Sequence, residues 1–309
     1  MELKSLQYGD YSAVINLSLG ANCISLRNRR YGVRLLREPD YKKGELDNPY
    51  LYGMPILFPV NRISGGRFFF EGREYRFPVN EPSTGCHLHG LIHMQRFEVL
   101  EESDARVLCA YRNDGSLYPS FPHAFEIRIE YTLGDDGLKQ VTEVFNHSSK
   151  RMPCLLGFHT TFCIDFCGEG EVLAGADLAK EFERNMRVYL PTGRTPVFDE
   201  VSRALEEERF SPVSQPISRH YRAGDNGVMT LFNRDRGVRI LYENDPQYAF
   251  RLIYNGNANE YICMEPQTCL ANAPNAPFDR AESGFDSIEP HASKIYTSKI
   301  YIVKEDILS

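Results

Sequence analysis

Four side chains of the kinds that transfer protons or hold hydroxyl groups stand in four short segments rich in strand-forming and turn-forming residues. They are Arg62, His89, His159 and Glu265. A base, an acid and two polar groups that orient a ligand are what an enzyme that moves protons requires. The four residues are therefore the first candidates for a polar site, provided that the fold brings their segments together.

Glu265 follows the apolar run of residues 261–264 and directly precedes Pro266. A carboxylate at the rim of a buried strand has its pKa raised by desolvation, which suits a general base near neutral pH. Because Pro266 lacks an N–H, we expect the strand to end there and a loop to follow. Judged from this segment alone, Glu265 could equally be a solvent-exposed glutamate on an edge strand.

His159 follows the apolar residues 154–158 and precedes Thr160 and Thr161. A histidine in such surroundings is usually a hydrogen-bonded core residue, but here the threonine hydroxyl groups could fix the ring tautomer that catalysis needs. Arg62 lies in a loop-like segment, where a guanidinium group could hold sugar hydroxyl groups in its fork of donors. A loop arginine paired with an acid is the alternative for Arg62.

His87 and His89 alternate along an extended segment, so we expect both imidazoles to point to the same face. Together with His93 they could chelate a metal, but no carboxylate accompanies them, and we expect no metal site there.

The eight cysteines form no Cys-x-x-Cys pair, and Cys163 and Cys167 do not have a standard zinc spacing. We therefore expect buried thiols and neither a metal nor another cofactor.

Alternation of apolar and polar residues dominates the chain and predicts antiparallel strands. In residues 125–133 every odd position is apolar, and residues 134–137 then supply a turn before a returning strand at 138–145. Hairpins or strands of the same kind are predicted at residues 68–77, 228–242 and 295–302. One short surface helix is predicted over residues 199–210, capped by Asp199. The fold class is therefore all-β, a large antiparallel β-sandwich with few short helices.

The 309 residues include 35 basic and 42 acidic side chains, which gives a net charge of −7. No basic patch or run suggests a nucleic-acid partner. No window reaches about 18 uninterrupted apolar residues, so we expect no membrane-spanning helix. Residues 1–7 contain no apolar core of a secretory signal, and a cytoplasmic location is expected. No linker divides the chain, which predicts one domain over residues 1–309.

Several short motifs occur in an order that is informative as a set. They are Asn61-Arg62-Ile63, Leu88-His89-Gly90, Tyr189-Leu190-Pro191-Thr192-Gly193 and Glu265-Pro266-Gln267, with His159 between the second and the third. Together they resemble the aldose 1-epimerase (galactose mutarotase-like) superfamily. The stretch at residues 53–59 looks more like a less characterised bacterial branch of it. The resemblance covers most of the chain and implies the galactose mutarotase-like β-sandwich.

This resemblance implies an isomerase that interconverts the α and β anomers of a free aldohexose without a cofactor. Glu265 would remove the proton of the anomeric hydroxyl group, and His159 would protonate the ring oxygen. The residues that would bind the sugar are Arg62, His89, Gln267 and Ser218. Ser218 stands where the family often has an Asp that contacts sugar hydroxyl groups. The chain also contains no Trp. The sequence therefore decides neither which sugar is preferred nor which aromatic ring stacks on it.

Three other functions share parts of this pattern. A hexose-phosphate 1-epimerase would need more basic groups at the site, for which Arg62, Arg67 and Arg219 are candidates. A glycoside hydrolase or lyase would need a second carboxylate opposite the first, such as Asp165 or Asp245. A non-catalytic carbohydrate-binding or sensor protein would keep the pocket without turnover. A homodimer also stays open, because nothing in the sequence decides the oligomeric state.

Overall fold

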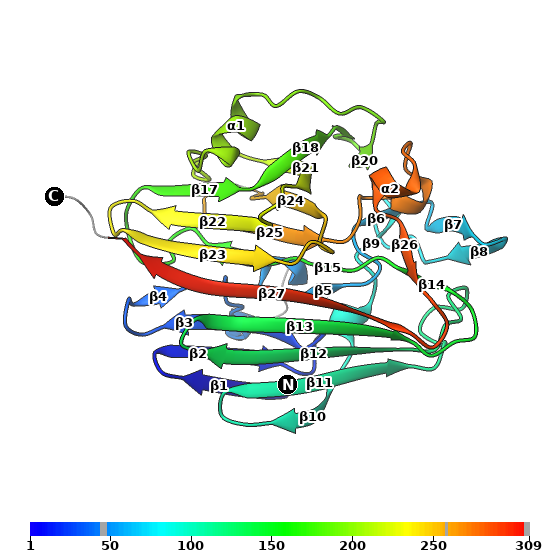
Figure 1. Ribbon diagram of the computed structural model, residues 1–309, viewed down its shortest axis with the longest axis horizontal. Helices are drawn as coiled ribbons and strands as arrows, with labels where there is room; N and C mark the ends of the chain where they lie inside the picture. Colours follow the sequence, from blue (N-terminus) through cyan, green and yellow to red (C-terminus); the bar gives the residue numbers. More distant parts are fainter. Residues whose placement is uncertain (44–47, 257–258, 306–309) are drawn as a thin grey trace.

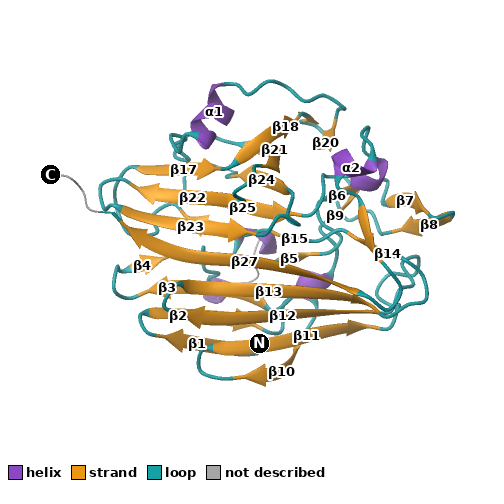
Figure 2. Ribbon diagram, in the orientation of Figure 1, coloured by secondary structure: helices purple, strands orange, loops and turns teal. Residues whose placement is uncertain are grey.

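The computed structural model describes residues 1–43, 48–256 and 259–305. Strands dominate these residues, and the helices are few and short (Figure 2), which confirms the all-β prediction. The largest sheet is antiparallel and has eight strands. In the order in which they pair, they are β10 (Glu98–Glu102), β11 (Arg106–Asn113), β12 (Phe125–Gly134), β13 (Gly137–Asn146), β27 (Ser293–Lys304), β23 (Val238–Asn244), β22 (Val228–Asn233) and β17 (Val172–Ala176).

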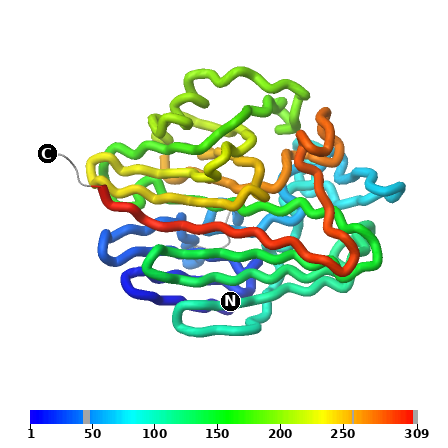
Figure 3. Tube along the Cα trace, in the orientation of Figure 1, coloured from blue at the N-terminus to red at the C-terminus, as the bar shows by residue number. Residues whose placement is uncertain are grey.

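The strand that comes last in the sequence, β27, lies in the middle of this sheet. It pairs with β13 on one side and with β23 on the other (Figure 1), and in Figure 3 the red strand runs between the green and yellow hairpins. β12 and β13 form the expected hairpin, with Gly134 paired to Gly137 beside the turn. Gly137 has a φ of 95°, a conformation that glycine adopts without steric cost. The predicted hairpins at residues 68–77 and 228–242 are also confirmed.

A second antiparallel sheet carries the strands on which the polar candidates stand. Its strands, in pairing order, are β18 (Leu178–Phe182), β21 (Ser218–Ala223), β24 (Phe250–Tyr254), β25 (Tyr261–Gln267), β15 (Gly157–Phe158) and β5 (Ile56–Leu57), and β16 (Thr161–Cys163) also pairs with β25. The prediction that the strand ends at Pro266 is wrong. Gln267 still pairs with Phe250 and with Gly157, so the ladder extends past the proline.

The two sheets pack face to face through large buried side chains. Phe162 of β16 meets Tyr242 of β23 edge-on, with the ring centroids 5.7 Å apart. The Thr160 hydroxyl oxygen lies 3.0 Å from that of Tyr242. Fully burying a side chain the size of Phe162 stabilises the fold by about 1.5–3 kcal/mol. This face-to-face packing is that of a β-sandwich.

The remaining strands form a smaller sheet and four short pairs. The smaller sheet consists of β1 (Leu3–Tyr8), β2 (Tyr11–Asn16), β3 (Asn22–Asn28) and β4 (Val33–Arg34). The pairs are β6 (Arg62–Ser64) with β9 (Cys86–Leu88), β7 (Arg67–Phe70) with β8 (Arg73–Arg76), β14 (Met152–Cys154) with β26 (Asp286–Ile288), and β19 (Arg184–Asn185) with β20 (Leu190–Pro191). The pairs β6–β9 and β19–β20 supply residues to the cavity described below.

Two short α-helices and four 3-10 turns complete the described chain. They are α1 (Glu200–Glu206), α2 (Arg280–Ser283), η1 (Tyr41–Lys43), η2 (Pro49–Leu51), η3 (Ile92–Met94) and η4 (Ala273–Asn275). Asp199 caps α1 as predicted, because its side chain accepts a hydrogen bond from the Ser202 N–H. The helix is shorter than expected, since Phe210 leaves it and its carbonyl accepts from the Ala174 N–H at 2.7 Å. Within the described residues, no helix is long and apolar enough to cross a membrane.

Candidate active site

A cavity of about 840 Å³ opens over the second sheet, where several segments distant in sequence meet. Its lining includes Arg62, His89, His159, Ser218 and Glu265. The fold therefore brings together the four residues from which the sequence argument started, and adds Ser218. Among the described residues, four tyrosine rings also line the cavity: Tyr50, Tyr189, Tyr254 and Tyr261.

Glu265 stands on the central strand β25 and has no solvent exposure. The reading as a solvent-exposed edge-strand glutamate is therefore wrong, because β24 pairs beside it and places Leu252 opposite. Its Oε2 accepts a hydrogen bond of 3.0 Å from the Gln267 amide. Burial raises the pKa of the Glu265 carboxyl to about 8, an effect that this amide and the more distant Arg184 and Arg62 only partly offset. Burial thus favours a protonated carboxyl at neutral pH.

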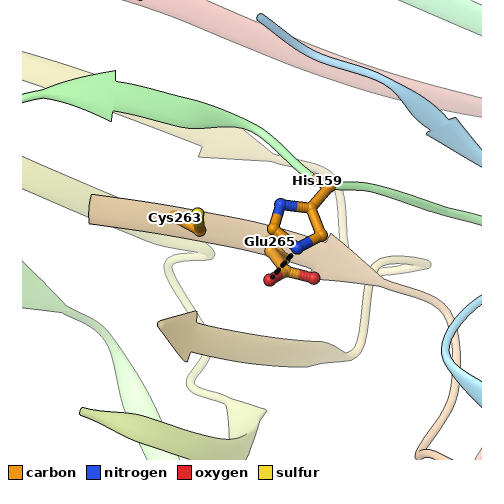
Figure 4. Close-up of side chains that lie close together, drawn as sticks. All are labelled: His159, Cys263 and Glu265. Atoms are coloured by element: carbon orange, nitrogen blue, oxygen red, sulfur yellow. Dashed lines mark ion pairs between the residues drawn. The ribbon is translucent and has the colours of Figure 1, made fainter. Parts of the chain in front are cut away.

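His159 follows β15 and reaches the same point from the neighbouring strand. Its Nε2 lies 3.2 Å from Oε1 of Glu265 (Figure 4). Burial lowers the pKa of the imidazole to about 3, so the ring is uncharged at neutral pH. The threonine hydroxyl groups do not reach the ring, contrary to expectation. Thr160 turns to Tyr242 in the opposite sheet, and the Thr161 hydroxyl donates to the His159 carbonyl oxygen.

His89 points into the cavity and makes a T-shaped ring contact with His159, at 5.5 Å between centroids. Its other neighbour is Tyr50, whose ring centroid lies 4.6 Å away. Burial lowers the pKa of His89 well below its ordinary value, so this imidazole is also neutral. The expectation that His87 shares its face is wrong. His87 stacks on Phe77 at 5.0 Å instead.

The backbone explains why the two histidines separate. β9 ends at Leu88, and His89 has a φ of 61°, which breaks the alternation of an extended strand. The following Gly90 also has a positive φ, and a Cβ there would lie 2.0 Å from the Phe58 carbonyl oxygen. Only glycine fits this close approach, and the His-Gly sequence turns the imidazole toward the cavity.

Arg62 combines the two alternatives that the sequence left open, because it lines the cavity and is also paired with an acid. Its Nε donates to Oε2 of Glu81 at 2.6 Å, and its Nη2 donates to Oε1 at 2.7 Å. The guanidinium carbon lies 4.6 Å from the Tyr189 ring centroid. Such a bidentate pair holds the Arg62 side chain in one orientation. Sequence reasoning missed Glu81, which belongs to no strand and lies 19 residues after its partner Arg62 of β6.

Gln267 lies behind the carboxyl of Glu265 and is fully buried. Its amide joins Glu265 to Asn61, since Asn61 Nδ2 donates to Gln267 Oε1 at 3.2 Å. It is absent from the lining of the cavity among the described residues. A direct contact between Gln267 and a sugar therefore stays a prediction, whereas its contact with the carboxyl is part of the structure.

Arg184 is a cavity residue that sequence reasoning missed. It belongs to β19, is only 7% exposed, and donates from Nη2 to the Ser218 hydroxyl at 2.8 Å. Burial lowers the pKa of its guanidinium group to about 10, which leaves it cationic at neutral pH. The polar run around residue 184 resembles an exposed turn. The sequence feature that could have pointed to Arg184 as a site residue is its position shortly before the motif that begins at Tyr189.

The residues named for the alternative functions lie largely elsewhere. Arg219 pairs with Asp199 at 2.7 Å on the far side of β21. Asp165 pairs with Arg34 at 3.1 Å and is well exposed. Within the described chain, the cavity lining contains two carboxylates, and the second, Glu81, is already bound by a guanidinium group. The arrangement therefore does not favour the two facing carboxylates of a glycoside hydrolase.

One group of described residues has the types and spacing of metal ligands. The ligand atoms of His159, Cys263 and Glu265 all lie within 4.8 Å of one another (Figure 4). A thiol binds a metal only as the thiolate, and burial raises the pKa of Cys263 well above its ordinary value. All eight cysteines are buried, as expected. The donor set is therefore a poor fit for a resident metal, and no step below is assigned to one.

Comparisons with known proteins agree with this geometry. The family model described as Aldose 1-epimerase matches residues 2–302. A galactose mutarotase-like protein from Clostridium acetobutylicum superimposes with a TM-score of 0.90 over 99% of both chains, at 28% identity. A putative aldose 1-epimerase from Escherichia coli K12 shares the fold, with a TM-score of 0.80 over 98% of this chain and 99% of that chain, at 17% identity. Uncharacterized protein YihR of Escherichia coli K12 is 24% identical over 281 residues, 89% of this chain and 86% of its own length.

Proposed function

The chain belongs to the aldose 1-epimerase family, and we propose that it interconverts the α and β anomers of an aldose by acid–base ring opening and closure. The observation that carries the proposal is the 3.2 Å contact between His159 Nε2 and Glu265 Oε1 beside the cavity. The anomeric carbon bears both oxygens that must exchange protons, its hydroxyl oxygen and the ring oxygen. A base and an acid that serve these two oxygens must converge on one point, as this pair does.

In the proposed step, the Glu265 carboxylate accepts the proton of the anomeric hydroxyl group. The electron pair of that O–H bond forms the C1 carbonyl, the bond between C1 and the ring oxygen breaks, and the ring oxygen takes the proton of the His159 imidazolium. Rotation about the C1–C2 bond then exposes the other face of the aldehyde. The reverse proton transfers close the ring with the opposite configuration, so no oxidant, reductant or cofactor takes part.

This step needs one proton on the pair, and it needs that proton on His159. Burial by itself favours the neutral form of both groups, which places the same single proton on Glu265. A bound sugar changes the balance. Its anomeric hydroxyl group donates to the carboxylate and its ring oxygen accepts from the imidazolium, and hydrogen bonds to a charged form favour that form. The proton then moves across the 3.2 Å contact before the ring opens.

Three further side chains are proposed to bind and orient the sugar: Arg62, His89 and Ser218. The neutral His89 is held by Tyr50 and can donate or accept a hydrogen bond. Arg62 is fixed by Glu81, so its remaining donors act without reorganisation when the sugar binds. Positioned acid–base groups contribute about 10²–10⁴-fold each to the rate. Positioning of the sugar supplies much of the rest.

We also propose that residues 1–309 act as one domain. The support is the large sheet, which takes strands from residues 98 to 304 and places β27 in its middle.

The experiment follows the anomerisation of freshly dissolved aldoses by polarimetry with wild type, Glu265→Gln and His159→Asn. We expect both variants to lose the acceleration while sugar binding persists. Glu126→Gln is a matched control, because Glu126 is also buried but pairs with Arg112 and Arg128 on β12, away from the cavity. Full activity of Glu265→Gln would refute the proposal. Binding of sugar without acceleration by wild type would instead favour a carbohydrate-binding or sensor protein.

A further inference from the structure

The part of the cavity formed by β19 and β21 contains a positive charge that the nearby acids Glu265 and Glu181 only partly offset. Arg184 is 7% exposed, and its side chain donates one hydrogen bond to a described residue, the uncharged Ser218. Among the described residues, no carboxylate forms an ion pair with it. A buried cation without a counter-charge is costly, since desolvation is not repaid by an ion pair. Arg184 lines the cavity, and its guanidinium group has further N–H donors besides the one that binds Ser218.

The other charged groups of the cavity leave this charge uncompensated. Arg62 and Glu81 form a bidentate pair and cancel each other. Burial keeps the imidazoles of His89 and His159 neutral and favours the protonated carboxyl of Glu265. The described part of the cavity lining therefore carries about one net positive charge, which is located at Arg184.

The sheet register places this charge at a distance from the proton-transferring pair. Ser218 of β21 pairs with Tyr254 of β24, and Tyr254 pairs with Cys263 of β25. Neighbouring strands lie about 4.8 Å apart, so the backbone of Ser218 is roughly 10 Å from that of β25 across the cavity floor. This separation suits an aldose whose anomeric carbon lies at Glu265 and whose last carbon reaches toward Arg184.

Both guanidinium groups of the cavity lie over the ring of Tyr189. The guanidinium carbon of Arg184 lies 5.9 Å from its centroid, and that of Arg62 lies 4.6 Å away. The two arginines differ in their partners. Arg62 is held by the carboxylate of Glu81, whereas Arg184 has donors left to bind a ligand. A planar guanidinium group with free donors matches a carboxylate or a phosphate in geometry as well as in charge.

We propose that the substrate is an aldose with an acidic substituent on the carbon farthest from the anomeric centre, and that Arg184 binds this substituent. The shared chemistry is a carboxylate or a phosphate group, as in a uronic acid or a hexose 6-phosphate. This inference rests on the proposed function for its catalytic readout, but it goes beyond it because it names the class of sugar. A neutral hexose could accept hydrogen bonds from Arg184, but it would offer no charge to pair with this buried cation.

The test measures kcat/KM for anomerisation of glucose, glucuronate and glucose 6-phosphate by exchange NMR. It compares wild type with Arg184→Gln, which keeps a hydrogen-bond donor but loses the charge. We expect at least one acidic sugar to be preferred over glucose, and Arg184→Gln to lower kcat/KM for it by roughly 10- to 100-fold, as for loss of a charged hydrogen bond. Activity toward glucose should fall less than activity toward the acidic sugar, because glucose loses only the support that Arg184 gives to Ser218. The acid that responds more strongly identifies the carboxylate or the phosphate as the preferred group.

The matched control is Arg194→Gln, which removes an exposed arginine paired with Glu183 outside the cavity. It should change none of these values. Equal rates for acidic and neutral sugars in wild type, or an equal loss for both in Arg184→Gln, would overturn the inference. If Arg184→Gln does not fold, Arg184→Lys serves instead, since it keeps the charge but loses the fork and should retain part of the preference.

A separate measurement distinguishes failure of this inference from failure of the proposed function. Titration calorimetry with glucuronate, glucose 6-phosphate and glucose reports binding without catalysis. If no sugar is anomerised faster than in buffer, the proposed function fails. The inference still stands if an acidic sugar binds to wild type and binds at least roughly 10-fold more weakly to Arg184→Gln. It falls if glucose binds as tightly as both acidic sugars.

Discussion

Replacing Glu265 with Gln should change how the stability of the protein depends on pH, and the sign can be worked out from the structure. The carboxyl has an ordinary pKa of 4.5 and a folded pKa of about 8. Between these values the folded chain holds a proton that the unfolded chain releases. Stability from this group is therefore fully present below pH 4.5 and is lost as pH rises toward about 8.

His159 acts in the opposite direction, because its pKa falls from 6.5 to about 3 on folding. In wild type the contributions of Glu265 and His159 cancel between their two ordinary values, since the folded and unfolded states each hold one proton there. Above pH 6.5 the contribution of Glu265 acts alone. In Glu265→Gln the contribution of His159 remains and that of the carboxyl is gone. The difference between variant and wild type therefore isolates the carboxyl.

The magnitude follows from linkage. Each pH unit in this range changes the free energy of unfolding by about 1.36 kcal/mol per proton. Relative to wild type, Glu265→Gln should thus gain about 4 kcal/mol of stability between about pH 5 and pH 8. Urea unfolding at several pH values measures the difference, and all unchanged groups cancel in it.

Glu126→Gln provides the control for this measurement. Although burial acts to raise its pKa, the Arg128 and Arg112 side chains hold the pKa of Glu126 below its ordinary value. Its stabilising contribution is therefore constant above that value and is lost only in acid. The difference between Glu126→Gln and wild type should be flat over the range in which the Glu265→Gln difference changes. A flat result for Glu265→Gln as well would refute the reasoning, because it would mean that the folded carboxyl is already ionised over this range and that its removal changes no bound proton.

Three further predictions concern the same site. The value of kcat/KM should fall as pH rises above about 8, because the pair of Glu265 and His159 then loses its single proton. A carboxylate acting alone would instead give a kcat/KM that rises up to that pH. Buffer-corrected rates measured across this range distinguish the two outcomes. His159→Asn should lower kcat by about 10²–10⁴-fold while calorimetry still detects the sugar, and loss of binding instead would assign the ring a structural role. Gly90→Ala should destabilise the fold by about 1–3 kcal/mol and raise KM, because the new Cβ would collide with the Phe58 carbonyl oxygen and displace His89. A free energy of unfolding in urea equal to that of wild type would contradict this prediction.

The sequence was sufficient for those parts of the fold that depend on local alternation. The strand expected at residues 125–133 is present as β12, and its hairpin partner is present as β13, since one face of each is buried. The expected helix was too long, because the burial of Phe210 against β17 depends on a contact distant in sequence. The strand through Pro266 was also misjudged, since its length depends on its partners on both sides.

The site could be predicted where residue type and motif agree, as for His159 and Glu265. It could not be predicted where a residue's role depends on a distant partner. Glu81 is informative only once Arg62 is known to bind it. Arg184 lies in a polar run typical of an exposed turn, and its burial arises from the chain segments that fold over it. The orientation of His89 depends on a positive φ that the residue type alone does not reveal.

The most direct test of the central claim is the rate at which optical rotation of a freshly dissolved single anomer reaches equilibrium, with wild type and with Glu265→Gln. Glucose, galactose, glucuronate and glucose 6-phosphate are each measured against buffer. The proposed acid–base pair predicts acceleration by wild type for at least one of these sugars and a loss of about 10²–10⁴-fold in Glu265→Gln. Equal acceleration by both proteins would contradict the assignment of Glu265 as the base, and no acceleration of any aldose by wild type would contradict the proposed function.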